Sequence, residues 1–327
     1  MWLTSSSVGR KFVMALTGIC LVLFVTFHCL MNAVAIVWPT AYNVICEFLG
    51  ANWYALVASA GLALLFVIHI IYALWLTLQN RKARGNDRYA VVAKPASVEW
   101  SSQNMLVLGI VVVAFLVVHL VQFWAKMQLV EICGCESTLP PAIGTLFIQE
   151  AFAMWWTPVV YIIGFVALWF HMNHGFWSMF QSIGWTNNAW LPRLKTVALW
   201  WTSIVIACFV AQAVVFTINA NNKYYIKNPE LREQYKAHIG EIVGIPADRF
   251  RFEQIPSEAD LKQAQQEIKM LESDPQMMQQ YGANAELIEN QKRTIENWLK
   301  VMEFVNYLNE KPAKVNPDEV GFDEPQQ

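Results

Sequence analysis

The chain has 327 residues, of which 56% are hydrophobic, 15 are tryptophan and only 15% are charged. Soluble domains carry about 25% charged residues, so the composition argues against an ordinary soluble protein. Residues 1–218 carry ten basic and six acidic side chains, and residues 219–327 carry thirteen and nineteen. Neither part has the basic excess that is typical of nucleic-acid binding. The sequence therefore predicts a membrane domain over residues 1–220 and a soluble, mainly helical extension over residues 221–327.

Five apolar runs in the membrane domain are long enough to cross a bilayer, which takes about 20 helical residues. They are apolar on every face, whereas the strands of a membrane barrel would alternate between polar and apolar residues. Because only helices and closed barrels satisfy every backbone group in lipid, the runs predict helices. The fold class that follows is all-α, a bundle of five transmembrane helices over residues 12–38, 53–78, 103–127, 152–180 and 196–218.

The charges between these runs predict which side of the membrane each connection faces. Basic residues gather before the first run, between the second and third, and between the fourth and fifth: Arg10, Lys11, Arg81, Lys82, Arg84, Arg88, Lys94, Arg193 and Lys195. The other connections hold Lys126 alone against four glutamates. Connections rich in lysine and arginine stay in the cytoplasm, which places the N-terminus inside. Five crossings then place the polar extension outside.

Five of the six histidines lie within the apolar runs, and ionisable side chains inside a bilayer are rare and usually functional. Four of them lie at matched depths when each helical residue is taken to rise about 1.5 Å. His28 and His119 lie about 15 Å from the outer ends of the first and third runs. His69 and His171 lie about 20 Å from the inner ends of the second and fourth runs. Histidines with unrelated packing roles have no reason to match in this way.

Paired imidazoles on facing helices of a bundle are the usual axial ligands of a haem iron. A zinc site would need three or four ligands at one level, and no acidic side chain lies at these depths. The depths predict two stacked b haems, an outer one held by His28 with His119 and an inner one held by His69 with His171. Two axial histidines leave the iron no open position, which favours electron transfer over oxygen chemistry. His174 follows three residues after His171 on nearly the same face, and spacing alone does not choose between them.

Five sequence segments around these residues carry a resemblance to a known family. They are SSSVGRKFVMALTG near the start, FVTFHCLMN around His28, FVIHIIYALW around His69, VVHLVQFW around His119 and FHMNHGFWSMFQSIGW from Phe170. Over about residues 5–220 the chain resembles the dihaem cytochrome b membrane subunit of succinate:quinone oxidoreductases and quinol:fumarate reductases, in the form with a single five-helix anchor. In that family the ligand of the fourth helix is followed four residues later by glycine and then aromatic residues. Gly175 and the aromatic residues after it therefore imply His171 as the ligand and leave His174 either to support the ligand or to pack against its neighbours.

The resemblance also implies partners, substrates and a location. The partners would be a flavoprotein subunit and an iron–sulfur subunit on the cytoplasmic face, in a complex that can form a dimer of heterotrimers. The chain would lie in a bacterial-type cytoplasmic membrane and pass electrons through two b haems between the iron–sulfur subunit and menaquinone or ubiquinone. It would act in an enzyme while binding no dicarboxylate itself, since it holds neither a dinucleotide glycine fingerprint nor a ferredoxin-like cysteine run.

Glu47 is the candidate proton acceptor of the quinone site. A quinol releases two protons with its two electrons, so its site needs a carboxylate or a similar acceptor. Glu47 and Glu150 both lie in outer connections, on the side of the outer haem. The related dihaem quinol:fumarate reductases use an acidic residue between the first and second helices, which favours Glu47. A solvated loop carboxylate is the competing interpretation.

The outer connections also hold three of the six cysteines, Cys46, Cys133 and Cys135. Disulfides are permitted in that compartment, so Cys46 could bridge to either of the other two. In the extension, Ser257 and Asp260 predict a capping box ahead of one amphipathic helix, and an apolar stripe from Ile288 to Val305 predicts a second. Two such helices suggest a hairpin that packs on itself or on the bundle.

Two other functions stay open at this point. One is a dihaem cytochrome b anchor of another respiratory complex, of the formate dehydrogenase or hydrogenase type. The other is a haem-free transport or assembly protein with functional intramembrane histidines. Transporters often show repeated halves with broken helices, and the sequence shows no such repeat.

Overall fold

The computed structural model of the protein describes residues 6–50, 52–84, 100–135, 137–246, 248–252, 255–274, 276 and 285–309. All regular structure within these ranges is helical. The chain forms two compact units, which are described separately. The first comprises Met1–Cys135 and Pro141–Tyr225, and the second Glu136–Pro140 and Ile226–Gln327. The sequence predicted a boundary at residue 220 and did not predict that the short segment 136–140 would belong with the extension.

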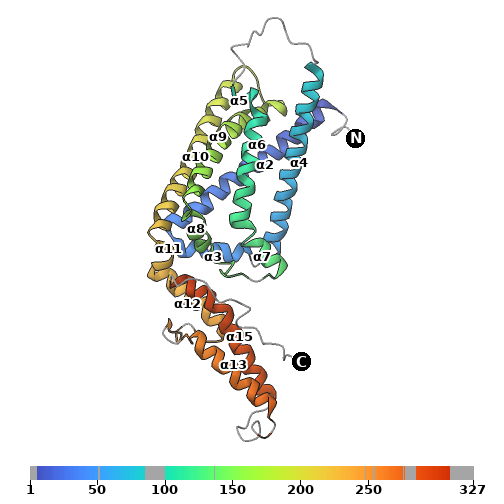
Figure 1. Ribbon diagram of the computed structural model, residues 1–327. Coiled ribbons are helices and arrows are strands. Elements are labelled where there is room, and N and C mark those ends of the chain that lie inside the picture. The colour runs from blue at the N-terminus through green and yellow to red at the C-terminus, as the bar shows by residue number, and fades with distance from the viewer. Residues whose placement is uncertain are drawn as a thin grey trace. The chain divides into compact units, whose positions relative to one another are not determined.

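Five helices in the described part of the chain are long and apolar enough to cross a membrane, which confirms the prediction of an all-helical, multi-pass membrane protein. They run side by side in the first unit (Figure 1). They are α2 (Ser7–Val37), α4 (Trp53–Arg84), α6 (Met105–His119) continued by the π-helical turn η1 (Leu120–Trp124), α9 (Trp156–Ser182) and α10 (Trp190–Asn221).

The ends of these helices differ from the predicted runs because polar residues continue them. Helix α2 begins at Ser7, where the Ser6 hydroxyl caps it by accepting from the Gly9 amide at 2.9 Å. Helix α10 begins at Trp190, well before the predicted start at residue 196. Its first turns hold Lys195, whose ammonium lies 4.4 Å from the Trp177 ring centroid. Long basic side chains can lie along aromatic surface at a helix end, so charge there does not stop the helix.

Helix α9 is central to the first unit and contacts α2, α6 and α10, while α2 also contacts α4. Small residues allow the closest approaches. A Cβ atom on Gly164 of α9 would overlap the ring of Phe115 on α6. Indole N–H groups join other helices, since Trp169 donates to Ser203 at 3.0 Å and Trp201 donates to Thr26 at 3.2 Å. Each of these donors thereby finds a partner inside an apolar unit.

Three short helices that the sequence did not predict lie together at one end of this unit (Figure 1). They are α3 (Pro39–Gly50), α7 (Gln128–Cys133) and α8 (Gly144–Phe152), and α5 (Trp100–Gln103) lies at the other end. Helix α8 takes up residue 152, so the fourth span starts later than predicted, at Trp156. The Thr145 amide donates to Asn43 Oδ1 at 3.0 Å and joins α8 to α3. Residues 85–99, which hold the basic residues Arg88 and Lys94, lie outside the described ranges.

The second unit is built from α12 (Pro229–Val243), α13 (Glu258–Ser273) and α15 (Ala285–Leu308), and the short helix α11 (Tyr224–Lys227) crosses the boundary between the units. The capping box is confirmed, because the Asp260 amide donates to Ser257 Oγ at 3.2 Å and the Ser257 amide donates to Asp260 Oδ2 at 2.8 Å. The apolar stripe of α15 is buried, and α15 contacts both α13 and α12. The predicted extension beyond residue 309 lies outside the described ranges.

Candidate functional site

One histidine pair in the first unit joins α2 to α6. The ring centroids of His28 and His119 lie 5.7 Å apart, with an angle of 82° between the ring planes. Phe24 stacks on His28 at 5.4 Å, and Phe123 lies 5.3 Å from His119. The two imidazoles therefore meet in a largely apolar environment. The sequence predicted that these two histidines lie at the same depth.

The other pair joins α4 to α9. The ring centroids of His69 and His171 lie 6.4 Å apart, with an angle of 61° between the ring planes. Helices α2 and α6 approach this pair through glycines. A Cβ atom on Gly18 would lie 3.9 Å from Cε1 of His69, and one on Gly109 would lie 3.6 Å from Cε1 of His171. At Gly18 and Gly109 these two helices therefore present only backbone to the Cε1 edges of the rings.

Thr17 fixes the orientation of the His69 ring. Its Oγ1 donates to the Val13 carbonyl at 3.0 Å and lies 3.1 Å from His69 Nδ1. Because the hydroxyl proton is used in the bond to the carbonyl, the oxygen lone pair is available to accept from an Nδ1–H group. This arrangement leaves the lone pair of His69 on Nε2, the nitrogen that would face a metal.

Tyr161 and Asn32 contact the rings of the first pair. The Tyr161 hydroxyl lies 3.1 Å from His119 Nδ1. The Asn32 amide nitrogen donates to the His28 carbonyl at 2.8 Å and lies 3.2 Å from Nε2 of the same histidine. In this arrangement Asn32 contacts Nε2 of His28, so Nδ1 is the ring nitrogen that Asn32 leaves uncontacted. Tyr42 of α3 completes this chain of polar groups by donating to Asn32 Oδ1 at 3.3 Å.

The second pair contains His171 and not His174. His171 faces His69, and its Nδ1 atom is buried without a hydrogen-bond partner among the described residues. His174 contacts Trp177, with ring centroids 4.7 Å apart. The histidine that the resemblance implies is thus the one next to His69.

The two pairs fit an ion that takes only two ligands from the protein. Two imidazoles that bind one metal ion through bonds of about 2 Å have ring centroids about 6 Å apart. The observed separations of 5.7 and 6.4 Å lie on either side of that value. The described part of the chain holds no group of three or more His, Cys, Asp or Glu side chains that could hold a metal. The donor set therefore suits an iron whose remaining ligands come from a macrocycle, as in haem.

Polar contacts at the end of α6 and in η1 were not predicted from the sequence. Gln122 in η1 is buried, and its Nε2 donates to Thr157 Oγ1 on α9 at 3.0 Å. One turn further along, Lys126 forms an ion pair with Glu150 at 2.6 Å. Sequence inspection missed Gln122 and Thr17 because isolated polar residues in an apolar run have no distinctive spacing.

Glu47 lies on the exposed face of α3. The neighbouring Cys46 is partly buried, and burial raises the pKa of its thiol to about 11. Glu131 of α7 lies near the C-terminal end of α3, where a Cβ atom on Gly50 would lie 2.6 Å from its Oε2 atom. Burial raises the pKa of this carboxyl as well.

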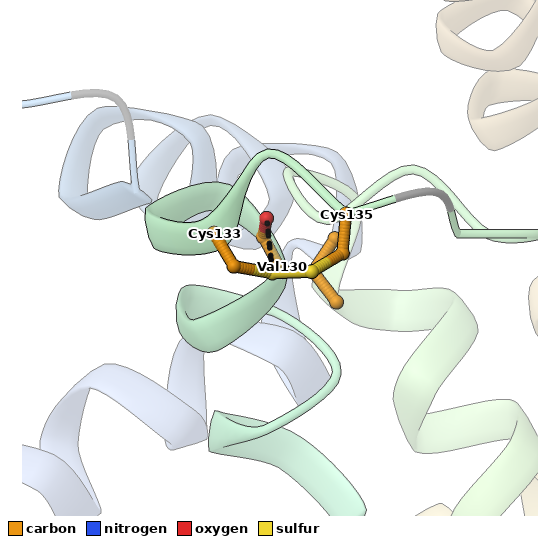
Figure 2. Close-up of a disulfide and its surroundings, with 3 residues drawn as sticks. All are labelled: Val130, Cys133 and Cys135. Carbon is orange, nitrogen blue, oxygen red and sulfur yellow. Dashed lines mark hydrogen bonds between the residues drawn. A yellow bond between two sulfur atoms is a disulfide. The ribbon is translucent and has the colours of Figure 1, made fainter.

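Cys133 and Cys135 form a disulfide with each other at the end of α7, as Figure 2 shows. Cys46 remains a thiol, so the bridge from Cys46 to one of them, which the sequence left open, is not formed. The intervening Gly134 adopts a left-handed conformation with φ of 62°, which brings the two cysteines to a Cα–Cα separation of 5.2 Å. The turn at Gly134 thus brings Cys133 and Cys135 close enough to bond to each other.

The fold and these contacts define a helical multi-pass membrane protein with two histidine pairs inside its spans. No known protein family, curated protein or solved structure matches the chain.

Proposed function

We propose that the chain is the membrane-anchor cytochrome b subunit of a succinate:quinone or quinol:fumarate oxidoreductase. The observation that carries this proposal is the presence of two histidine pairs drawn from four different spans, α2 with α6 and α4 with α9. Each pair has the separation that axial ligation of one iron requires. The sequence segments around the four histidines support the choice of this family among dihaem membrane proteins.

Within each pair, the chain would hold two imidazoles toward one iron and fix their orientation. Thr17 and Tyr161 would bind the Nδ1 side of His69 and His119, which leaves Nε2 for the iron. The aromatic side chains around His28 and His119 would keep water away from the metal. A bound haem supplies reversible one-electron transfer at these positions. Electrons would pass between an iron–sulfur partner subunit on the cytoplasmic side and menaquinone or ubiquinone in the membrane.

The haem content of the purified complex tests this proposal. A pyridine haemochrome assay should give two b haems for each copy of the chain. His171→Ala should retain one haem, because its partner His69 alone would not hold the iron. His174→Ala is the matched control, three residues along the same helix, and should retain two.

Fewer than two b haems in the unaltered protein would reject the proposal. Loss of a haem from His174→Ala, with retention by His171→Ala, would reject the assignment of the ligand. Co-purification of a flavoprotein and an iron–sulfur subunit would separate this function from a formate dehydrogenase or hydrogenase anchor. Their absence from a complex that holds two haems would favour that alternative.

Glu47 is the proposed proton acceptor for quinol oxidation. Its place on the exposed face of α3 would let a proton taken from quinol pass to the outer solution. Glu47→Gln should abolish quinol turnover and leave both haem spectra unchanged. Glu131 is another carboxylate at this end of the bundle and serves as the control, so Glu131→Gln should retain quinol turnover. Normal turnover in Glu47→Gln would remove this residue from the mechanism.

A further inference from the structure

Gln122 is a buried amide that the histidine pairs do not use. Its exposed fraction is 7%, and its Nε2 donates to the fully buried Thr157 at 3.0 Å. Its Oε1 atom is buried without a hydrogen-bond partner among the described residues. If the oxygen and nitrogen of the amide were exchanged, Oε1 would accept from the Thr157 hydroxyl and Nε2 would be the buried atom without a partner, since Thr157 offers a single hydroxyl. A buried polar atom without a partner is costly in an apolar span, so this one indicates a missing partner.

The backbone around Gln122 is also unusual. It belongs to η1, in which the Ala125 amide donates to the Leu120 carbonyl at 2.7 Å. Such π-helical turns are rare, and they occur frequently at functional sites because they change the direction of the side chains that follow. Here the π-turn begins directly after His119 and carries Gln122 into the interior of the unit.

The Gln122–Thr157 contact repeats the contact of the histidine one turn away. His119 of α6 faces Tyr161 of α9 with 3.1 Å between Nδ1 and the hydroxyl. One turn toward the outer end, Gln122 faces Thr157 across the same two helices. A group bound to the amide would therefore lie within one helical turn of the proposed outer haem ligand.

We propose that the Gln122 amide binds the head group of the quinone substrate beside the outer haem, an inference that rests on the proposed function. A quinol donates hydroxyl protons and a quinone accepts at its carbonyls, and an amide can accept from the first through Oε1 or donate to the second through Nε2. A neutral, lipid-soluble ligand also suits a site inside a span, because a charged ligand would pay a large desolvation penalty there.

Access to this site would be lateral, from the bilayer. The side chains next to Gln122 on the lipid-facing surface, Val121 and Trp124, are exposed. A ligand dissolved in lipid would pass between such side chains and would not need to cross the polar outer connections. The chain offers Gln149 as a matched control, because it is equally buried and its Oε1 also has no partner among the described residues. Gln149 lies on α8, outside the spans, and its Nε2 donates to the Ala220 carbonyl at 2.7 Å.

The test uses the purified full complex and titration with heptyl-hydroxyquinoline N-oxide, a quinol analogue whose fluorescence is quenched on binding. Gln122→Leu removes both polar atoms and should weaken binding of the analogue at least tenfold. It should keep two haems per chain and should not lower the unfolding temperature, because it removes an unsatisfied buried atom. Gln149→Leu should bind the analogue as tightly as the unaltered complex.

Binding by Gln122→Leu at the unaltered affinity would overturn the proposal and would mean that the amide holds only an internal water. A tenfold loss in Gln149→Leu with none in Gln122→Leu would also overturn it. If Gln122→Leu loses haem, the Thr157→Val variant provides the test instead. It removes the hydroxyl that holds the Gln122 amide and should weaken binding of the analogue severalfold. Unchanged binding of the analogue by Thr157→Val would overturn the proposal. Failure of the proposed function would appear separately, as fewer than two haems or no analogue binding in the unaltered complex.

Discussion

At the scale of single residues, hydrogen bonds to the histidine rings are the means by which the chain would adjust the haems of the proposed function. A group that accepts from Nδ1–H makes an imidazole a better electron donor to its metal, and so stabilises the oxidised iron. Thr17 is in this position toward His69, at 3.1 Å. His171 across the pair has no partner at Nδ1 among the described residues. Among the described residues, Thr17 is therefore the hydrogen-bond partner at Nδ1 through which the chain would adjust the potential of a metal held by His69 and His171.

With the proposed haems bound, Thr17→Val should raise the midpoint potential of the haem at His69 and His171 by on the order of 40 mV, the one-electron equivalent of losing a hydrogen bond worth about 1 kcal/mol. The outer haem should keep its potential, and both haems should stay bound. Redox titration followed at the haem absorption bands measures this. Thr26→Val is the control on the same helix, because Thr26 bonds to the Val22 carbonyl and to Trp201 but contacts neither histidine pair. Equal shifts of both haems, or no shift, would contradict the role given to Thr17.

The four histidines could be found from the sequence because each is an ionisable residue in an apolar run, and its depth follows from a count along one helix. Their partners could not be found in this way. Thr17 and His69 are separated by 52 residues in the chain, and Gln122 and Thr157 by 35. Threonine in a membrane helix commonly bonds to its own preceding turn, as Thr26 and Thr202 do, so Thr17 looks no different from them before the helices are packed.

At the scale of elements, the packing of α9 against α6 depends on Gly164. The ring of Phe115 occupies the space that a side chain on Gly164 would need. Phe115 also lies 6.1 Å from the ring of His119 with an angle of 29° between the planes. A small residue on one helix thus lets an aromatic side chain on the next one support a histidine of the His28–His119 pair.

Gly164→Ala should destabilise the protein by about 1–3 kcal/mol, the usual cost of adding atoms to a packed interior. Gly61→Ala on α4 is the control, because nothing lies within 4 Å of a Cβ atom there. It should be neutral or slightly stabilising, since alanine favours a helix over glycine. Thermal unfolding in detergent compares the two variants. If Gly164→Ala were as stable as Gly61→Ala, Phe115 would have room to move and the packing argument would fail.

The spans could be predicted as helices, because a run of about 20 apolar residues can cross lipid with all its backbone groups hydrogen-bonded only as a helix. The short helices α3, α7 and α8 were not, since their lengths and mixed composition do not distinguish them from loops before they meet one another. Pro39 at the first position of α3 is the one local signal that marked a helix start, because proline is favoured there. The π-turn has no sequence signal of this kind, because it depends on how α6 meets its neighbours.

At the scale of the whole molecule, composition separates two kinds of polypeptide in one chain. The first unit buries few charges, and its long helices expose large apolar side chains that lipid would cover. The second unit is built from amphipathic helices whose apolar faces pack against one another, and Leu261, Ile288 and Trp298 are all buried. That division follows from charge density and could be read from the sequence. The membership of residues 136–140 in the second unit could not, because it depends on contacts such as that of Thr138 with Glu303 at 2.9 Å.

The disulfide at the end of α7 bears on how the protein would be made. Cys133 and Cys135 are two residues apart, so their bridge needs no other part of the fold. The loop charges predict that this segment emerges into an oxidising compartment, where the bridge can form before the spans have assembled. The other thiol on this side, Cys46, is partly buried in the folded unit, and a thiol with a pKa of about 11 holds almost no thiolate to attack a disulfide at neutral pH. With this predicted orientation, oxidation during biogenesis would be independent of helix assembly, and the spans would find their partners without a covalent link that could fix a wrong arrangement.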